Sequence, residues 1–299
     1  MEDKITKFWA HEKRVSVMCV ELTNLVEEIR KIHDLTPTTT AVLGRVAIVS
    51  TMMAHLNLKE TTDNLTIQIK GNGPIGSIVS LCELENFRTA LIKVYADEPH
   101  IELPLKENGK IDVGGAVGNL GYLNVIRQND LTLGKYNGII PLVSGEIAED
   151  FTEFFAKSEQ KPTALALGVL VNKDGVKRAG GFIINPMPDA TDEDITKIEQ
   201  AISKAKPISQ MLDDGLNLEE IAKIVTGDEN VTIMQQDLKV KYKCNCNKDR
   251  LERGIISLGK EEISKIIEED GKVDSECNFC HKKYHFGKEE LEQMLMKAK

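Results

Sequence analysis

Four of the six cysteines in this chain of 299 residues lie close together near its C-terminal end. Cys244 and Cys246 are separated by one residue, Cys277 and Cys280 are separated by two, and thirty residues lie between the pairs. Two such pairs suit a tetrahedral zinc site, because each pair can supply one edge of the tetrahedron. The C-x-C half and the long gap differ from a common zinc ribbon. The pattern therefore predicts one zinc ion held by four cysteines.

Two histidines next to the second pair are alternative ligands. His281 directly follows Cys280, and His285 lies four residues further on. If either histidine bound the zinc, one thiol would be left unused, so we expect the four cysteines to be the ligand set. A second alternative concerns the role of the site, because most four-cysteine zinc sites are inert structural centres.

The same four residues are able to carry out redox chemistry. Zinc ligands are thiolates, and oxidants attack thiolates. Each cysteine has a partner close in sequence, so Cys244 can close on Cys246 and Cys277 on Cys280. A disulfide sulfur is a poor zinc ligand, so oxidation would release the metal. Zinc contributes roughly 10 to 16 kcal/mol to such units, whereas a core this small contributes about 3 to 5 kcal/mol. We therefore expect the unit to unfold without zinc.

The segment before the cysteines differs in composition from the rest of the chain. Residues 187–240 contain no aromatic residue and carry 12 acidic against 5 basic side chains, −7 of the net charge of −9. Helical periodicity follows two candidate caps, Thr191 and Asn217. Such helices bury little apolar area against the entropy of ordering them. We expect an acidic helical linker that folds by leaning on its neighbours, and a plain helical linker is the alternative.

Residues 1–183 are expected to form one domain that mixes helices and strands. Helices are predicted at 22–35, 40–56 and 144–158, the last with Ser144 as its N-cap, and strands at 65–70, 88–96, 122–128 and 136–143, with a hairpin joining 163–171 to 178–185. The predicted fold class is α+β, with a core domain over residues 1–183, the acidic helical linker over 184–240 and a small zinc-binding redox-switch domain over 241–299.

Several other signals favour ordinary structural roles. The glycine-rich stretch "GNGPIG" at 71–76 matches a dinucleotide motif, but the residues after it alternate like a strand and Pro74 removes an amide, so we expect a turn and no nucleotide. Cys19 and Cys82 have apolar neighbours and are predicted to be core residues. We find no hydrolase motif and expect no enzymatic activity. The acidic net charge argues against a general nucleic-acid surface, and no signal peptide or membrane span is evident, so we expect a cytoplasmic protein.

The cysteine pairs and their context resemble the 33-kilodalton heat-shock family of redox-regulated chaperones. The stretches that carry the resemblance are "YKCNC", "LERGIISLGKEEI", "CNFCHKKYHF", "GNLGYLNVIRQ", "GEIAEDFTEFFAKSEQKPTALALGVLV" and "AGGFIINPMP". The resemblance implies an ATP-independent holdase that is inactive when reduced and zinc-bound. It further implies that oxidation forms two disulfides, Cys244–Cys246 and Cys277–Cys280, releases zinc, unfolds the linker and favours a homodimer that binds unfolded client proteins.

Two other functions remain open at this point. One is a nucleic-acid-binding regulator with a zinc module, since basic residues surround the first pair in "KYKCNCNKDRLER". The other is a thiol–disulfide oxidoreductase that uses Cys277 and Cys280, which would require a thioredoxin-like βαβ setting for that pair.

Overall fold

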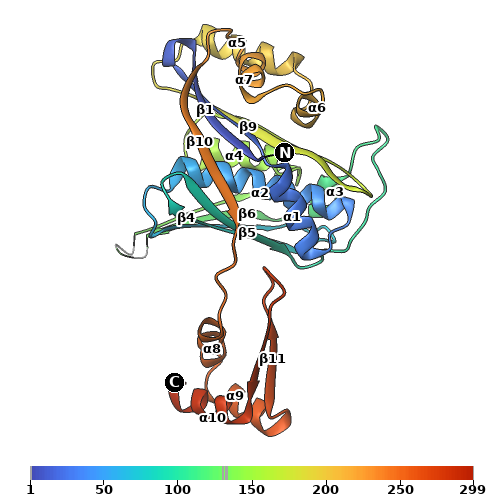
Figure 1. Cartoon of the computed structure of the whole chain (residues 1–299), viewed down its shortest axis with the longest axis vertical. Coiled ribbons are helices and arrows are strands. Elements are labelled where there is room, and N and C mark those ends of the chain that lie inside the picture. The colour runs from blue at the N-terminus through green and yellow to red at the C-terminus, as the bar shows by residue number, and fades with distance from the viewer. Residues whose placement is uncertain (1, 130, 132–133, 299) are drawn as a thin grey trace. The chain divides into compact units, whose positions relative to one another are not determined.

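The computed structural model describes residues 2–129, 131 and 134–298. Contacts between Cα atoms divide the chain into two compact units, Met1–Lys243 (the large unit) and Cys244–Lys299 (the small unit). Figure 1 labels the helices and strands of both units. The overall class is α+β, as the sequence predicts.

The large unit is built around one ten-stranded sheet with the strand order β7-β6-β3-β4-β5-β10-β1-β2-β9-β8. Its strands are β1 (Lys4–Ala10), β2 (Val15–Glu21), β3 (Asp63–Lys70), β4 (Ser77–Asn86), β5 (Thr89–Ala96), β6 (Tyr122–Asn129), β7 (Lys135–Pro141), β8 (Ala164–Asn172), β9 (Gly175–Pro186) and β10 (Thr232–Tyr242). Strand β10 pairs in parallel with β5 and antiparallel with β1, so it joins two antiparallel halves into one sheet.

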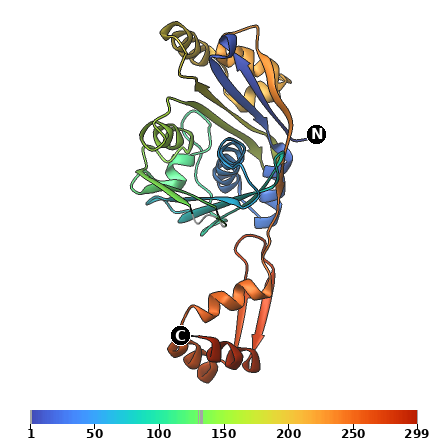
Figure 2. The same ribbon diagram turned by 90° about the vertical axis from the view of Figure 1, so that its left-hand side faces the viewer.

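The helices of the large unit lie against this sheet. They are α1 (Thr23–His33), α2 (Pro37–Asn57), α3 (Val113–Val117), α4 (Ala148–Lys157), α5 (Asp192–Lys204), α6 (Ile208–Asp213) and α7 (Leu218–Thr226), with the short 3₁₀ turn η1 (His11–Lys13) between β1 and β2. In Figure 2 the central blue helix, α2, is seen almost end-on with strands on more than one side of it. The main core of the unit therefore surrounds α2.

Helix α2 is a core helix, and its apolar residues are distributed around its whole circumference. By length and composition it is also long enough to cross a membrane, but 83% of its apolar window is buried inside the protein. The sequence predicted a helix here and gave no sign of how completely it is covered. A helix that is hydrophobic all round is typical of the centre of a large core as well as of a membrane span.

Strand β2 carries buried side chains on both faces. Met18 and Val20 belong to the main core, whereas Val17 and Cys19 belong to a second cluster on the opposite face. Successive side chains of a strand point to opposite faces of the sheet, so this half of the sheet has a covered layer on each side. Neither β1 nor β2 was predicted from the sequence. For β2 the reason is that a strand buried on both faces lacks the alternation of apolar and polar residues that identifies a half-buried strand.

The second cluster is covered by helices α5, α6 and α7, which we call the helical layer. Ile198, Met211 and Ile221 of these helices pack against Phe8 and Phe182 of the sheet. Figure 1 shows the three helices together beside β1 and β9. Both predicted caps are present, because Thr191 accepts a hydrogen bond from the amide of Asp194 and Asn217 accepts from Glu219 and Glu220.

The segment expected to be helical over 184–240 therefore has two parts. Its helices extend from Asp192 to Thr226, and β10 follows over Thr232–Tyr242 as a strand that the sequence analysis did not anticipate. The other expected elements are present, with one correction. The predicted N-cap of α4, Ser144, is wrong, because α4 begins at Ala148 and the carboxylate of Asp150 accepts the amides of Val143, Ser144 and Ile147.

The small unit consists of three helices and a hairpin: α8 (Lys248–Ile256), α9 (Lys260–Glu269), α10 (Lys288–Lys297), β11 (Lys272–Glu276) and β12 (Lys283–Gly287). The sequence stretches 248–259, 260–270 and 288–298 have helical character and match the three helices, whereas the hairpin was not predicted. Among the described residues its core cluster has seven buried members: Ile255, Ile263, Tyr284, Phe286, Leu291, Met294 and Ala298.

Candidate metal centre

The four clustered cysteines come from two loops of the small unit. Cys244 and Cys246 lie in the extended segment before α8, and Cys277 and Cys280 lie in the turn between β11 and β12. Their four sulfur atoms all lie within 4.8 Å of one another, with Cys244–Cys277 at 3.7 Å and Cys246–Cys280 at 3.4 Å. The fold thus brings together the four residues that the sequence predicted as ligands.

The turn that presents the second pair is held by its own main chain. The amides of Cys280 and His281 both donate to the carbonyl of Cys277, at 3.2 and 2.8 Å, and the amide of Cys277 donates to the carbonyl of Lys282 at 3.0 Å. His281 adopts a left-handed backbone with φ of 57°. These bonds curl the C-x-x-C segment so that both sulfurs face the same point.

The spacing of the sulfurs fits a zinc ion. A Zn–S bond of about 2.3 Å in a tetrahedron separates neighbouring sulfurs by about 3.8 Å, close to the distances seen here. Thiolates are the ligands that closed structural zinc sites use most. Cys277 is buried and the other three are half-buried, so the centre is close to the surface. The four cysteines could therefore hold a metal ion, and this ligand set suits zinc.

Tyr284 supports the centre from the hairpin. Its hydroxyl donates to the sulfur of Cys246 at 3.1 Å, and the ring is buried in the core of the small unit. Burial raises the pKa of Cys244 and of Cys280. Burial acts in the same direction on Cys246, but hydrogen bonds led by that from Tyr284 outweigh it and lower its pKa to about 7. No sequence pattern indicates this role for Tyr284.

The two histidines considered as alternative ligands have carboxylate partners instead. His281 Nδ1 lies 2.7 Å from Glu276, and His285 Nδ1 lies 2.7 Å from Asp274, and both histidines are exposed. The cluster of possible metal ligands found in the described part of the chain consists of the four cysteines alone.

The two rival functions find little support in the surroundings of the cysteines. Cys277 and Cys280 lie in a hairpin turn, whereas a thioredoxin-like site requires a βαβ setting. Of the basic residues near the first pair, Lys241 lies 2.6 Å from Glu85 and Lys243 lies 3.4 Å from the same carboxylate. Lys248 is paired with Glu290. These lysines are therefore partly neutralised by acidic partners.

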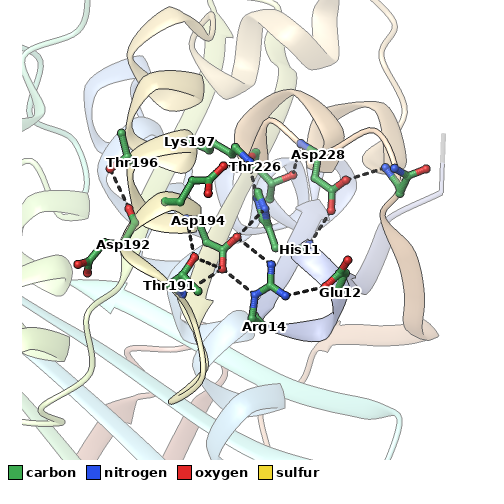
Figure 3. A network of polar contacts seen from close by, with 12 residues as sticks. His11, Glu12, Arg14, Thr191, Asp192, Asp194, Thr196, Lys197, Thr226 and Asp228 are labelled. Atoms are coloured by element: carbon green, nitrogen blue, oxygen red, sulfur yellow. Dashed lines mark hydrogen bonds and ion pairs between the residues drawn. The ribbon is translucent and has the colours of Figure 1, made fainter.

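A polar network in the large unit links the β1–β2 turn to both ends of the helical layer (Figure 3). Arg14 donates to Asp194 of α5 at 2.8 and 3.1 Å. His11 lies between Asp194, 3.3 Å from Nδ1, and the carbonyl of Thr226 at the end of α7, 2.9 Å from Nε2. The amide of His11 donates to Asp228 at 2.5 Å. No sequence pattern indicates this network, because its members lie about 200 residues apart along the chain.

The turn in this network has an uncommon backbone. Three successive residues, His11, Glu12 and Lys13, have φ between 47° and 72°. Side chains other than glycine rarely adopt this region, and such residues persist where the surroundings hold them in place. The contacts to Asp194, Thr226 and Asp228 supply that restraint, so the docked helices and the turn stabilise each other.

Comparisons with known proteins find one family over almost the whole chain. The family model described as "Hsp33 protein" matches residues 3–287. A "33 kDa chaperonin" of Acetivibrio thermocellus is 44% identical over 293 residues, covering 97% of this chain and 96% of the relative. A protein of the same name from Halalkalibacterium halodurans is 40% identical over 299 residues, covering 100% of both chains. The crystal structure of the 33 kDa chaperonin (heat shock protein 33 homolog) from Thermotoga maritima superposes with a TM-score of 0.84 at 35% identity, covering 99% of each chain.

Proposed function

The chain belongs to the Hsp33 protein family of chaperones, and we propose that it is a redox-regulated, ATP-independent holdase that binds unfolded proteins under oxidative stress. The observation that carries this proposal is the convergence of four thiols, within 4.8 Å of one another, in a unit with seven buried core residues. When bound, zinc would tie these four thiolates together and so stabilise the small unit. The reduced, zinc-bound protein is the inactive form in this proposal.

Oxidation removes the ligands in pairs. Two thiolates of a pair give two electrons to a peroxide, the S–S bond forms, the O–O bond breaks, and two protons complete two molecules of water. We propose the pairs Cys244–Cys246 and Cys277–Cys280, because each pair is close in sequence. All four sulfurs lie within 4.8 Å of one another, and the two distances given above join Cys244 to Cys277 and Cys246 to Cys280. The proposed pairing therefore rests on sequence proximity and the family resemblance, and the sulfur positions do not select it. The disulfide sulfurs bind zinc poorly, and the small unit then loses its order.

The large unit has apolar surface that it could offer to clients once the helical layer undocks. The layer covers a face of the sheet formed by Phe8, Ala10, Val15, Val17, Cys19, Phe182 and Ile184. An exposed apolar area of this kind binds other apolar chains. The layer connects to the small unit through β10 and Lys243, so we propose that loss of order in the small unit spreads to the layer. The oxidised protein would then be a homodimer that holds unfolded clients.

The remaining expectations are part of the same proposal. We infer that the protein acts in the cytoplasm, where thiols are normally reduced and an oxidative signal is informative. We also infer that it needs neither nucleotide nor nucleic acid nor a membrane, and that it is not an enzyme. The relatives named above are chaperonins by name, which agrees with a binding function.

The test compares two redox states of the full chain. Aggregation of a chemically unfolded client is followed by light scattering with the reduced, zinc-loaded protein and with the peroxide-treated protein. We expect suppression by the oxidised protein alone, and re-reduction in the presence of zinc should abolish it. Equal suppression in both states would rule out redox control. Peptide mapping of the oxidised protein by mass spectrometry tests the disulfide pairing separately.

A further inference from the structure

Strand β10 is the seam of the ten-stranded sheet, and its pairing is irregular. It pairs in parallel with β5 over four residues, Lys239–Tyr242 against Thr89–Ile92. Its antiparallel ladder with β1 is interrupted by two register shifts, and Asp237 has a left-handed backbone with φ of 60°. The strand is therefore paired on both edges, but neither ladder runs along its full length.

Side-chain burial contributes little to holding β10. Of its eleven residues only Leu238 is buried. Ile233 and Met234, in its first half, are 52% and 46% exposed. Burial of apolar side chains is the main favourable term in folding, so β10 is one of the less strongly held strands of the sheet. Its place depends largely on main-chain hydrogen bonds.

Several of the groups that bind β10 recognise its main chain. The amide of Lys239 donates to the carbonyl of Arg88 at 2.7 Å, and the amide of Lys243 donates to Ile92 at 3.0 Å. His55 Nε2 lies 3.1 Å from the carbonyl of Lys239. Burial lowers the pKa of His55 to about 4, so the imidazole is neutral at pH 7. A carbonyl only accepts, so Nε2 carries the proton and donates to it.

The side chains of β10 define a simple pattern. Leu238, Val240 and Tyr242 contact the main core, and the lysines between them point outward. Lys241 and Lys243 lie beside Glu85. The position between β5 and β1 therefore accepts an extended segment with apolar residues at alternate positions, and it favours basic residues on the outer side.

We propose that β10 is displaceable and that the gap it leaves between β5 and β1 binds an extended segment of an unfolded client by strand addition. This inference rests on the proposed function. One end of β10 follows the helical layer, and Lys243 alone separates its other end from Cys244. Loss of order on both sides frees the strand. The vacated edges carry unpaired amides and carbonyls, and an unfolded chain supplies matching groups whatever its sequence.

A peptide copy of the strand tests the proposal on the full chain. The probe is a fluorescein-labelled peptide of residues 236–243, "QDLKVKYK", titrated by fluorescence anisotropy. The matched control carries N-methyl groups on the amides that correspond to Lys239 and Lys243, so both donors are lost while all side chains stay. We expect the oxidised protein to bind the probe at least about tenfold more tightly than the reduced, zinc-loaded protein does. The N-methylated peptide should bind about tenfold more weakly, as expected for two lost hydrogen bonds.

Hydrogen exchange locates the binding site for a real client. Adding a chemically unfolded client to the oxidised protein should protect the amides of Thr89–Ile92 and of β1, relative to the oxidised protein alone. Three results would overturn the proposal: equal binding of the two peptides, no protection of β5 on adding client, or protection of β5 that depends on protein concentration without client, which would place β10 of a second copy in the gap. If the oxidised protein suppresses aggregation while β5 stays unprotected, the proposed function stands and strand addition alone fails.

Discussion

The large unit and the small unit place their cysteines in opposite settings. Cys19 and Cys82 of the large unit are buried in apolar surroundings, and burial raises the pKa of Cys82 to about 12 and that of Cys19 as well. The four cysteines of the small unit face one another near the surface. A thiol buried among apolar side chains is out of reach of oxidants, whereas thiols near the surface are accessible to them. The position of a thiol in the fold therefore decides whether it packs or reacts.

The two units also differ in what holds them together. Among the described residues, the main cluster of the large unit has 44 buried hydrophobic members and that of the small unit has seven. Large cores fold on apolar burial alone, whereas units this small usually need a metal or a disulfide. We therefore expect the large unit to stay folded on its own core, and the fold of the small unit to depend on a bound metal.

The largest expected effect comes from removing one metal ligand. Cys277→Ser should abolish tight zinc binding and with it roughly 10 kcal/mol or more of stability, so the small unit should be unfolded while the large unit keeps its fold. Hydrogen exchange of residues 263–294 against residues 41–54 measures both in one experiment. Cys82→Ala is the matched control and should leave the small unit protected. If the small unit of Cys277→Ser kept protected amides, its fold would not depend on the metal, and the proposed difference between the two units would be wrong.

The second prediction concerns the helical layer, which belongs to the large unit but is proposed to respond to the small one. Ile221 is fully buried against the sheet, whereas Ile224 on the same helix is 40% exposed. Ile221→Asp buries a carboxylate without a partner, which costs several kcal/mol, and should release the layer. We expect it to suppress client aggregation while still reduced and zinc-loaded. Ile224→Asp should behave like the unchanged protein, and equal activity of the two variants would contradict a covering role for the layer.

The third prediction uses pH to weaken the network of Figure 3. The hydrogen bond from Arg14 is the largest of the causes that hold the pKa of Asp194 far below its ordinary value. A carboxyl with a lowered pKa stabilises the folded state above its unfolded pKa of about 4. That contribution is lost progressively as pH falls below about 4, so the helical layer should undock in acid.

The comparison of two neutral variants isolates this contribution. Asp194→Asn should weaken docking at pH 7 and reduce its further loss in acid, as followed by exchange of α5 and α7 amides. Glu193→Gln on the exposed side of the same helix turn is the control and should change little. If the two variants showed the same acid profile, the network would have no special role in docking.

How much of this arrangement the sequence predicts depends on the range of the interactions involved. The clustering of the four cysteines and the caps at Thr191 and Asn217 follow from local patterns of residue type and spacing, and the structure contains both. Strand β10 was missed, because it lies in an acidic segment and its partner Thr89–Ile92 is about 150 residues away. From the sequence, Tyr284 is indistinguishable from an ordinary core aromatic residue. Only the fold shows that its hydroxyl donates to the sulfur of Cys246.

The glycine-rich stretches show the same limit. A turn was correctly predicted for 71–76, which joins β3 to β4. The fold adds that a Cβ at Gly71 would lie 2.0 Å from the carbonyl oxygen of Val117, and one at Gly73 would lie 2.3 Å from that of Ala116. These glycines allow the turn after β3 to pack main chain against main chain on the end of α3. No local sequence pattern indicates which segment of the chain these glycines pack against.

The smallest predicted effect is within the metal centre itself. Tyr284→Phe removes one hydrogen bond to Cys246 and keeps the ring in the core. Changes to groups that orient metal ligands weaken binding by roughly tenfold or more, so zinc transfer to a competing chelator should be faster by about that factor. The small unit should stay folded when zinc is in excess. Unchanged transfer kinetics would show that the four cysteines alone set the stability of the centre.

The central claim is that the metal held by four oxidisable cysteines keeps the small unit folded. The most direct measurement is a peroxide titration of the reduced, zinc-loaded chain, in which zinc release, loss of free thiols and hydrogen exchange of the small unit are followed together. We predict that one zinc is released as four thiols are lost, that the small unit loses protection in the same proportion, and that Cys19 and Cys82 stay reduced. A small unit that keeps its protected amides after all zinc has left would contradict the account.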